Sequence, residues 1–142
     1  MQLVIGGAFA GKRDIVRKKH KEFSWVSSYH NDLLSNWDLK WQSGTTLVLE
    51  GWERWVKQQL KKEVEDAVIR VEFSRLFQCF LEEERLRNDC IVLIMLEVGR
   101  GIVPIEEDER RFRDLAGWIL QDAAKMAEEV QYVWHGMAKR LK

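Results

Sequence analysis

The sequence predicts an α/β domain built on a mainly parallel sheet, and three observations carry this prediction. Short apolar runs alternate with amphipathic helical stretches, a glycine turn directly follows the first run, and no internal repeat interrupts the pattern. Strands that alternate with helices form βαβ units, whose crossovers make a sheet parallel and cover both of its faces. With 142 residues, of which 46% are hydrophobic, the chain suffices for one core. We therefore expect one domain over residues 1–142.

Five short apolar runs, rich in β-branched residues or bounded by glycine, predict the strands. They are residues 2–5, 23–28, 45–50, 90–98 and 130–134. The last of them precedes a short basic tail. Continuous apolar runs such as 45–50 and 90–98 suit strands that are covered on both faces.

Helical periodicity occupies the stretches between these runs. Residues 12–22 are charged and compatible with a helix, and apolar residues recur at helical spacing from 112 to 126. Between residues 52 and 81 the spacing fits either one long helix or two, with a break marked by Val68, Ile69 and Val71. The polar connection 29–44 gives no clear element.

The charge balance argues against nucleic acid as a partner. Lysine plus arginine and aspartate plus glutamate both number 23, so no net field draws the protein to DNA, RNA or an anionic membrane. Residues 1–10 lack a basic region before the apolar run, so we expect neither a signal peptide nor a spanning helix, and a cytoplasmic location. We interpret Cys79 and Cys90 as reduced core thiols.

The glycine turn matches the G-x-x-x-x-G-K part of the P-loop and lies between a predicted strand and a predicted helix, the context this motif needs. Its amides and the following helix N-terminus would face phosphate oxygens, and Lys12 would add a positive charge and act as a catalytic residue. A plain glycine turn linking strand to helix is the alternative. The predicted phosphate-binding residues are Gly6, Gly7, Ala8, Phe9, Ala10, Gly11, Lys12 and Arg13.

Two residues decide whether a metal ion acts at this turn. Arg13 stands where a P-loop has Ser or Thr to hold Mg²⁺, and a guanidinium cannot ligate a cation. Glu50 ends a buried strand, where it would act as a catalytic acid on Mg²⁺, or else cap the helix that starts near Gly51. We expect anion binding to survive and the use of Mg²⁺ to be weakened.

A second loop leaves the carboxyl end of the strand 90–98 and so joins the same rim of a parallel sheet. Its glycines permit close backbone approach, and its arginines can reach an anion. The predicted second wall of the crevice consists of Glu97, Gly99, Arg100, Gly101 and Arg113. The alternative is a turn held by its glycines and Pro104.

The motif Glu97-Val98-Gly99-Arg100-Gly101-Ile102-Val103-Pro104, followed by Phe112-Arg113-Asp114-Leu115-Ala116-Gly117, resembles the adenosylcobinamide kinase/adenosylcobinamide-phosphate guanylyltransferase family of cobalamin biosynthesis. The resemblance extends to the glycine turn, to residues 47–50 with Trp55, and to Gln121 and His135-Gly136. It implies a three-layer P-loop (RecA-like) fold, a homotrimer, use of ATP or GTP, phosphorylation of adenosylcobinamide, and transfer of GMP from GTP.

The sequence lacks the histidine that the guanylyl transfer implied by the resemblance requires. The family carries the guanylylated histidine in a basic segment after the second strand, and nothing in residues 29–44 matches that segment. We therefore assign no catalytic histidine. We interpret His30 as a solvated loop residue and His20 as surface charge. The chain looks like a shortened, diverged member of the family.

Three hypotheses on function follow from these residues. The first is a nucleotide-dependent transferase acting on a cobinamide-type substrate, and the second is a nucleotide- or phosphate-binding regulatory module without turnover. The third is a structural subunit that uses tryptophans as an interface, although in a small domain tryptophans are more often core. These tryptophans are Trp25, Trp37, Trp41, Trp52, Trp55, Trp118 and Trp134.

Overall fold

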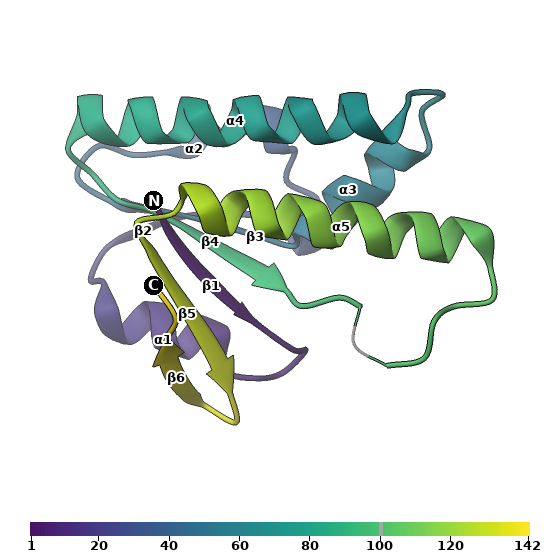
Figure 1. The fold of residues 1–142 in the computed structure, drawn as a ribbon. Helices are drawn as coiled ribbons and strands as arrows, with labels where there is room; N and C mark the ends of the chain where they lie inside the picture. Colours follow the sequence, from purple (N-terminus) through teal and green to yellow (C-terminus); the bar gives the residue numbers. More distant parts are fainter. Residues whose placement is uncertain (100) are drawn as a thin grey trace.

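The computed structural model describes residues 1–99 and 101–142, and within these ranges six strands form one sheet. Five strands run parallel in the order β2-β3-β4-β1-β5, and β6 pairs antiparallel with β5 at the edge (Figure 1). Their bounds are β1 Gln2–Gly6, β2 Phe23–Ser27, β3 Thr46–Glu50, β4 Ile91–Leu96, β5 Glu129–Trp134 and β6 Met137–Arg140. The predicted α/β class with a mainly parallel sheet is confirmed.

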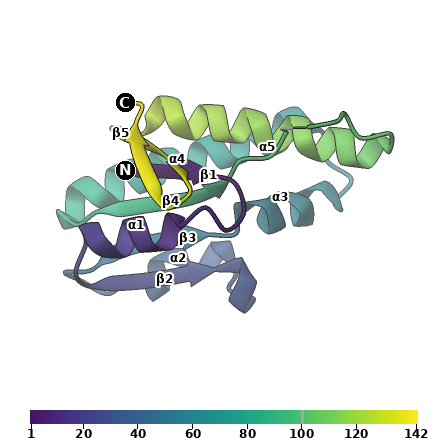
Figure 2. The ribbon, with the colours of Figure 1, turned by 90° about the horizontal axis from the view of Figure 1, so that it is seen from below.

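Helices cover both faces of the sheet, as the parallel crossovers require. In Figure 1, α4 and α5 lie above the sheet and α1 lies below it; in Figure 2, seen from below, α1 crosses in front of the central strands. The bounds are α1 Lys12–Lys19, α2 Trp37–Lys40, α3 Trp52–Leu60, α4 Asp66–Arg87 and α5 Glu107–Met126, with short 3₁₀ turns η1 at Ser28–His30 and η2 at Leu34–Asn36. The result is the three-layer arrangement of the P-loop fold.

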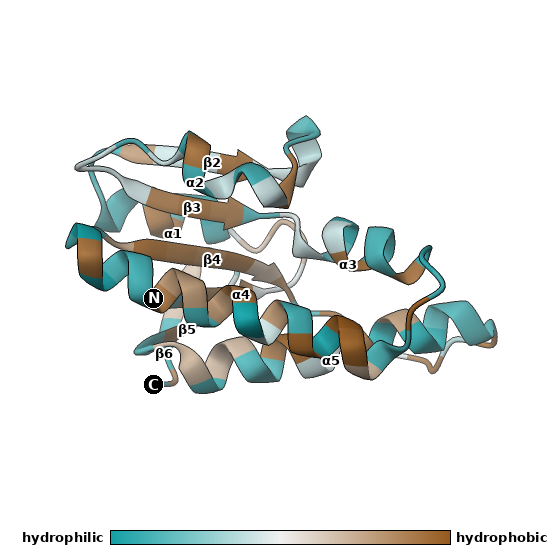
Figure 3. Ribbon diagram, turned by 90° about the horizontal axis from the view of Figure 1, so that it is seen from above, coloured by the Kyte–Doolittle hydropathy of each residue, from teal (hydrophilic) through white to brown (hydrophobic). Residues whose placement is uncertain are grey.

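The main core lies between the sheet and helices α2 to α5. Trp52 is its centre, with ring centroids 5.2 Å from Trp55, 5.6 Å from Phe77 and 6.3 Å from Phe80. All four of these side chains are buried. Strand β4 and the middle of β3 are hydrophobic in Figure 3, which fits their burial under helices on both sides.

The core beneath the sheet is smaller and is made by α1 alone among the helices. Val16 of α1 packs against valines and an isoleucine of the strands. The buried members of this second cluster are Val4, Val16, Val48, Val92, Ile94 and Val133. Only Val16 of α1 is fully buried; Ile15 is partly buried, and the other residues of this helix are charged.

The predicted helix break at residues 68–71 is wrong. The break falls between α3 and α4, at residues 61–65, and α4 runs without interruption through Val68 and Val71, whose side chains are exposed. Ile69 instead begins the buried stripe of α4, followed at helical spacing by Phe73, Phe77 and Phe80. The β-branched residues are therefore part of an amphipathic helix.

The basic tail expected after the last strand is in fact strand β6. A two-residue turn at His135 and Gly136, both with positive φ, folds the chain back so that Met137 pairs with Trp134. Such a turn matches the twist of the two strands. All four residues of β6 are exposed, so the sequence has no apolar run there from which the strand could be predicted.

Two interpretations of single side chains are also wrong. Cys79 is exposed on α4, whereas Cys90 is partly buried and burial raises the pKa of its thiol to about 11. His20 is half-buried, with Nε2 3.3 Å from Oε1 of Gln2 and Nδ1 3.2 Å from Oγ1 of Thr46. It joins the start of β1 to the start of β3 instead of belonging to a charged surface. Among the described residues, no helix has the length and apolar character needed to cross a membrane.

Candidate functional site

A cavity of about 620 Å³ lies at the carboxyl ends of the parallel strands. Strands β1 and β4 are neighbours there; the chain continues from β1 to α1 below the sheet, whereas α5, the next helix after β4, lies above it (Figure 1). Such a switch in crossover direction is where open α/β sheets bind ligands. The lining residues come from the glycine turn, the start of α1, the segment after β2, and the ends of β3 and β4. They are Ala8, Phe9, Ala10, Gly11, Lys12, Arg13, Asp14, Arg17, Tyr29, Glu50, Gly51, Glu53, Ile94 and Leu96.

The glycine turn takes its shape from two glycines that no other residue can replace without strain. A Cβ on Gly6 would lie 2.4 Å from the carbonyl oxygen of Val133 on the neighbouring strand. Gly11 has a φ of 96°, and its Cβ would lie 3.1 Å from Gly136. The amide of Gly136 donates to the carbonyl of Ala10 at 2.8 Å, so the β5–β6 hairpin braces the turn.

The side chain of Lys12 lies along the inside of this turn. Its ammonium donates to the carbonyls of Gly6, at 3.2 Å, and of Gly7. Burial lowers the pKa of Lys12, and the negative charges of Glu53 and Glu50 oppose that decrease. The amine is therefore desolvated and close to two carboxylates, on the wall of a cavity that can admit phosphate oxygens.

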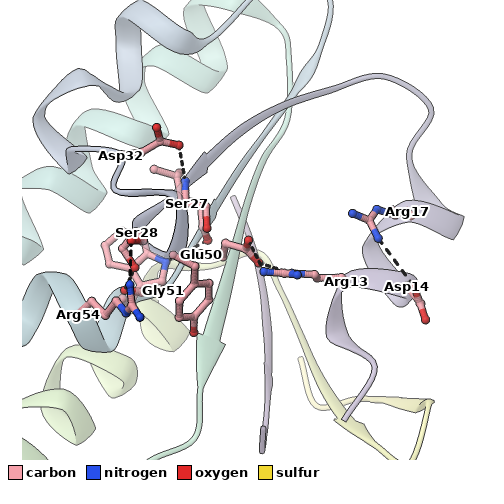
Figure 4. A network of polar contacts seen from close by, with 12 residues as sticks. Arg13, Asp14, Arg17, Ser27, Ser28, Asp32, Glu50, Gly51 and Arg54 are labelled. Atoms are coloured by element: carbon pink, nitrogen blue, oxygen red, sulfur yellow. Dashed lines mark hydrogen bonds and ion pairs between the residues drawn. The ribbon is translucent and has the colours of Figure 1, made fainter. Parts of the chain in front are cut away.

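Arg13 reaches from α1 across the cavity floor to Glu50, as Figure 4 shows. Nε donates to Oε2 at 2.8 Å and Nη2 to Oε1 at 2.8 Å, a bidentate pair that raises the pKa of the guanidinium. Glu50 is 4% exposed and Arg13 is 47% exposed. Both oxygens of the Glu50 carboxylate accept hydrogen bonds from Arg13, so this side chain pairs with the arginine.

This pair bears directly on the metal site expected from the sequence. Both carboxylate oxygens of Glu50 bind Arg13, which itself replaces the hydroxyl ligand of a P-loop. Within residues 1–99 and 101–142, no group of three His, Cys, Asp or Glu side chains could hold a metal ion. Glu50 therefore does not fit the role of a Mg²⁺ ligand, because its carboxylate is already neutralised by Arg13.

The same wall carries a second polar pair, Tyr29 and Glu53, which no sequence motif predicts. The hydroxyl of Tyr29 donates to Oε1 of Glu53, and the guanidinium carbons of Arg13 and Arg54 lie 5.9 Å and 5.3 Å from the centre of its ring. Burial, and then the bond to Glu53, raise the pKa of Tyr29 far above its usual value. The phenol thus remains a hydrogen-bond donor at neutral pH.

The turns after β2 and β3 are locked together beside this group. Ser28 donates through Oγ to the carbonyl of Gly51 at 2.7 Å, and Arg54 donates to the carbonyl of Ser28 at 3.3 Å (Figure 4). Gly51 has a φ of 84°, and a Cβ there would lie 1.9 Å from Ser28 Oγ. Tyr29 and Glu53 therefore project from a rigid junction. No motif marks Tyr29, because residues 29–44 match no pattern.

None of the described residues of the predicted second wall lines the cavity, although Leu96, directly before Glu97, does. Arg113 of α5 donates to the carbonyls of Gly99 and, at 3.2 Å, of Ile102, so it braces the loop. Glu97 accepts a hydrogen bond from the Tyr132 hydroxyl at 2.9 Å. Gly101 has a φ of 104°, with no atom within 4 Å of a built Cβ. Arg100, also predicted for this wall, lies outside the described residues.

The fold and the turn together define a protein of the P-loop class, with a strand, a glycine turn and a helix that carries Lys12 at its first position. The family model for cobinamide kinase / cobinamide phosphate guanyltransferase matches residues 16–141, and the chain belongs to this family. The match begins after the glycine turn. It includes Glu50, which pairs with Arg13, and the loop that follows β4. The resemblance expected from the sequence is confirmed.

Curated relatives match a shorter part of the chain. The bifunctional adenosylcobalamin biosynthesis protein CobP of Pseudomonas aeruginosa is 40% identical over 52 residues, which are 37% of this chain and 30% of that protein. The bifunctional adenosylcobalamin biosynthesis proteins CobU of Escherichia coli and of Salmonella typhimurium are each 44% identical over 52 residues, 37% of this chain and 29% of those proteins. The matched stretch thus spans under a third of these relatives' length.

Proposed function

We propose that residues 1–142 form one nucleotide-binding domain that acts in cobalamin biosynthesis as a transferase of the cobinamide kinase type. ATP or GTP would place its phosphates at residues 6–13, and a cobinamide-type acceptor would enter the cavity beside them. The observation that carries this proposal is Lys12, fixed between strand and helix on the wall of a cavity of about 620 Å³. Backbone amides at a helix N-terminus and a lysine are sufficient to bind a polyphosphate.

Several features of the whole protein belong to the same proposal. Balanced charge supports small-molecule partners over nucleic acid or a membrane, and family membership supports a cytoplasmic enzyme that assembles as a homotrimer. In the second wall, Glu97, Gly99, Arg100, Gly101 and Arg113 would shape the far side of the crevice. Arg113 supports that role, because it holds the carbonyls of the loop in place.

The arginine–glutamate pair gives the reaction its particular character. Because Arg13 lies where a P-loop cation would be held, its guanidinium would supply positive charge to the phosphates without a metal ion. Lys12 and Arg13 would orient the terminal phosphate and neutralise its developing charge. A second candidate function is a nucleotide-binding module without turnover, which the same pair favours, since metal-assisted transfer needs oxygen ligands that are engaged here.

Nucleotide binding is tested by the shift in melting temperature with ATP or GTP, since a ligand of the native state stabilises it by mass action. We expect a shift for the unmodified chain and a much smaller one for Lys12→Ala. Lys18→Ala is the matched control, because Lys18 is exposed on the same helix and does not line the cavity. Equal shifts for all three proteins would place the nucleotide elsewhere. Turnover of cobinamide then separates the enzyme from the binding module.

The role of Arg13 is tested by repeating these titrations with and without Mg²⁺. We expect removal of Mg²⁺ to change binding by the unmodified chain very little. In Arg13→Ser the hydroxyl is restored and Glu50 is released, so binding should become dependent on Mg²⁺ and any kinase activity should rise. Strong Mg²⁺ dependence and normal turnover by the unmodified chain would contradict the metal-free mode.

Guanylyl transfer through a histidine is not part of the proposal. The ring nitrogens of His20 face Gln2 and Thr46 at the amino ends of their strands, and no basic segment surrounds His30. We expect no protein-bound label after incubation with labelled GTP and denaturing separation. A stable covalent label would contradict this expectation.

A further inference from the structure

The carboxylate of Glu53 has one engaged oxygen and one buried oxygen without a partner. Oε1 accepts the hydrogen bond from Tyr29, while Oε2 is buried and has no hydrogen-bond partner among the described residues. A buried carboxylate oxygen is costly unless a donor satisfies it. Glu53 lines the cavity that also contains Lys12 and the glycine turn. A donor that enters this cavity and reaches Oε2 would satisfy it.

The surroundings of Glu53 fix its position and select the chemistry of that group. Tyr29 holds Oε1, and two guanidinium groups lie against the Tyr29 ring, so the carboxylate cannot turn freely. Two cations on the cavity wall, Lys12 and Arg13, are placed for phosphate oxygens. Glu53 would repel phosphate and attract a neutral donor such as a hydroxyl. On this wall Glu53 therefore suits a hydroxyl and not a phosphate.

We propose that Glu53 binds the hydroxyl of the phosphoryl acceptor and takes its proton, with Tyr29 as the residue that positions the carboxylate. The inference rests on the proposed function and names the residue at its acceptor end. The hydroxyl oxygen forms a bond to the γ-phosphorus as the bond from that phosphorus to the β–γ bridging oxygen breaks. The hydroxyl proton passes to the carboxylate of Glu53, and the nucleoside diphosphate leaves.

The main alternative is that Glu53 serves only the charge balance around Lys12. Its charge acts on that lysine, and on this alternative its loss would change nucleotide binding and leave the acceptor unaffected. An acceptor-site carboxylate has the opposite signature. Its loss leaves nucleotide affinity intact and weakens both acceptor binding and turnover.

The experiment compares the unmodified chain with Glu53→Gln, Glu53→Asp and Tyr29→Phe. Glu72→Gln is the matched control, because Glu72 is exposed on α4 and lies outside the cavity. Calorimetry measures GTP binding, then cobinamide binding in the presence of a non-hydrolysable GTP analogue, and an assay gives kcat and KM for cobinamide. Denaturant unfolding shows that each variant folds.

We expect Glu53→Gln to bind GTP as the unmodified chain does and to lose kcat by about 10²- to 10⁴-fold, the range for general base catalysis. Glu53→Asp should recover part of kcat, and Tyr29→Phe should lose less than Glu53→Gln. Turnover and cobinamide affinity of Glu53→Gln within threefold of the unmodified chain would overturn the proposal.

The same experiment separates this proposal from the one on which it rests. If the unmodified chain binds GTP but neither binds nor phosphorylates cobinamide, the acceptor site is refuted while the phosphate turn stands. If it binds no nucleotide at all, both proposals fail. Loss of GTP binding in Glu53→Gln without a change in cobinamide binding would favour the charge-balance alternative and overturn the acceptor role.

Discussion

The two faces of the sheet differ in how they are covered and in what they contribute. Helices α2 to α5 bury an aromatic core above the sheet, whereas α1 alone buries a few aliphatic side chains below it. The charged residues of the site lie where the two sides meet, at the carboxyl ends of β1 and β3. The stability of this protein therefore resides mainly above the sheet, and the thin lower layer is free to present Lys12 and Arg13.

The largest expected effect tests this division of stability. Phe77→Ala in the upper core should lower the free energy of unfolding by about 3–5 kcal/mol, because it removes a fully buried aromatic ring. Val16→Ala in the lower core should cost only about 1–2 kcal/mol, the value of two buried carbons. Urea unfolding of both variants measures the difference. Equal losses would show that the two faces contribute alike.

The next effect concerns the junction between the turns after β2 and β3. Gly51→Ala should cost about 1–3 kcal/mol, because the residue has positive φ and its Cβ would meet Ser28 Oγ. Gly44→Ala is the matched control, with a φ of 78° and no atom within 4 Å of the Cβ. Gly44→Ala introduces the same backbone strain but no steric clash. If both variants lose the same stability, the contact with Ser28 does not constrain the junction.

A smaller loss is expected when the pair across the cavity is broken. Arg13→Met keeps the aliphatic stem but leaves the buried Glu50 carboxylate unpaired, and we expect a loss of about 1–2 kcal/mol. The value lies below that for a fully buried pair because the side chain of Arg13 is 47% exposed. Adding Glu50→Gln should restore part of the loss. No recovery in the double variant would mean that Arg13 acts through other contacts.

The smallest effect is a dependence on pH at the amino ends of β1 and β3. Burial, and then the charge of Lys19, lower the pKa of His20 below its ordinary value of 6.5. As the pH falls below 6.5 the unfolded chain binds the proton first, so the free energy of unfolding should decrease. His20→Gln should flatten this slope between about pH 6.5 and pH 5. An unchanged slope would assign the dependence to other groups.

Local patterns were sufficient for much of the fold. Five of the strands follow from apolar runs, and the glycine turn follows from a motif whose residues are neighbours in the chain. The extent of α4 was mispredicted because a β-branched run was given more weight than helical spacing, although Ile69 fits the buried stripe of that helix. Strand β6 has no apolar face, so only its pairing with β5 reveals it.

Some residues of the candidate site could likewise be predicted from the sequence, and others could not. Lys12, Arg13 and Glu50 could each be named from the sequence, but two roles offered for Glu50 missed its bond to Arg13, 37 residues away in the chain. Tyr29 and Glu53 could not be named at all. Tyr29 lies in η1 after β2 and Glu53 lies in α3 after β3, and they meet because Ser28 and Gly51 hold these two segments together.

The sequence by itself determined the α/β class, the glycine turn and the family, because each depends on residue types at fixed spacing along the chain. The tertiary structure alone decided which charges neutralise one another and which oxygen is left without a donor. Pairing between Arg13 and Glu50, and the orphaned oxygen of Glu53, depend on distances between separate strands and helices. Such distances are set by packing of the whole sheet and not by local spacing.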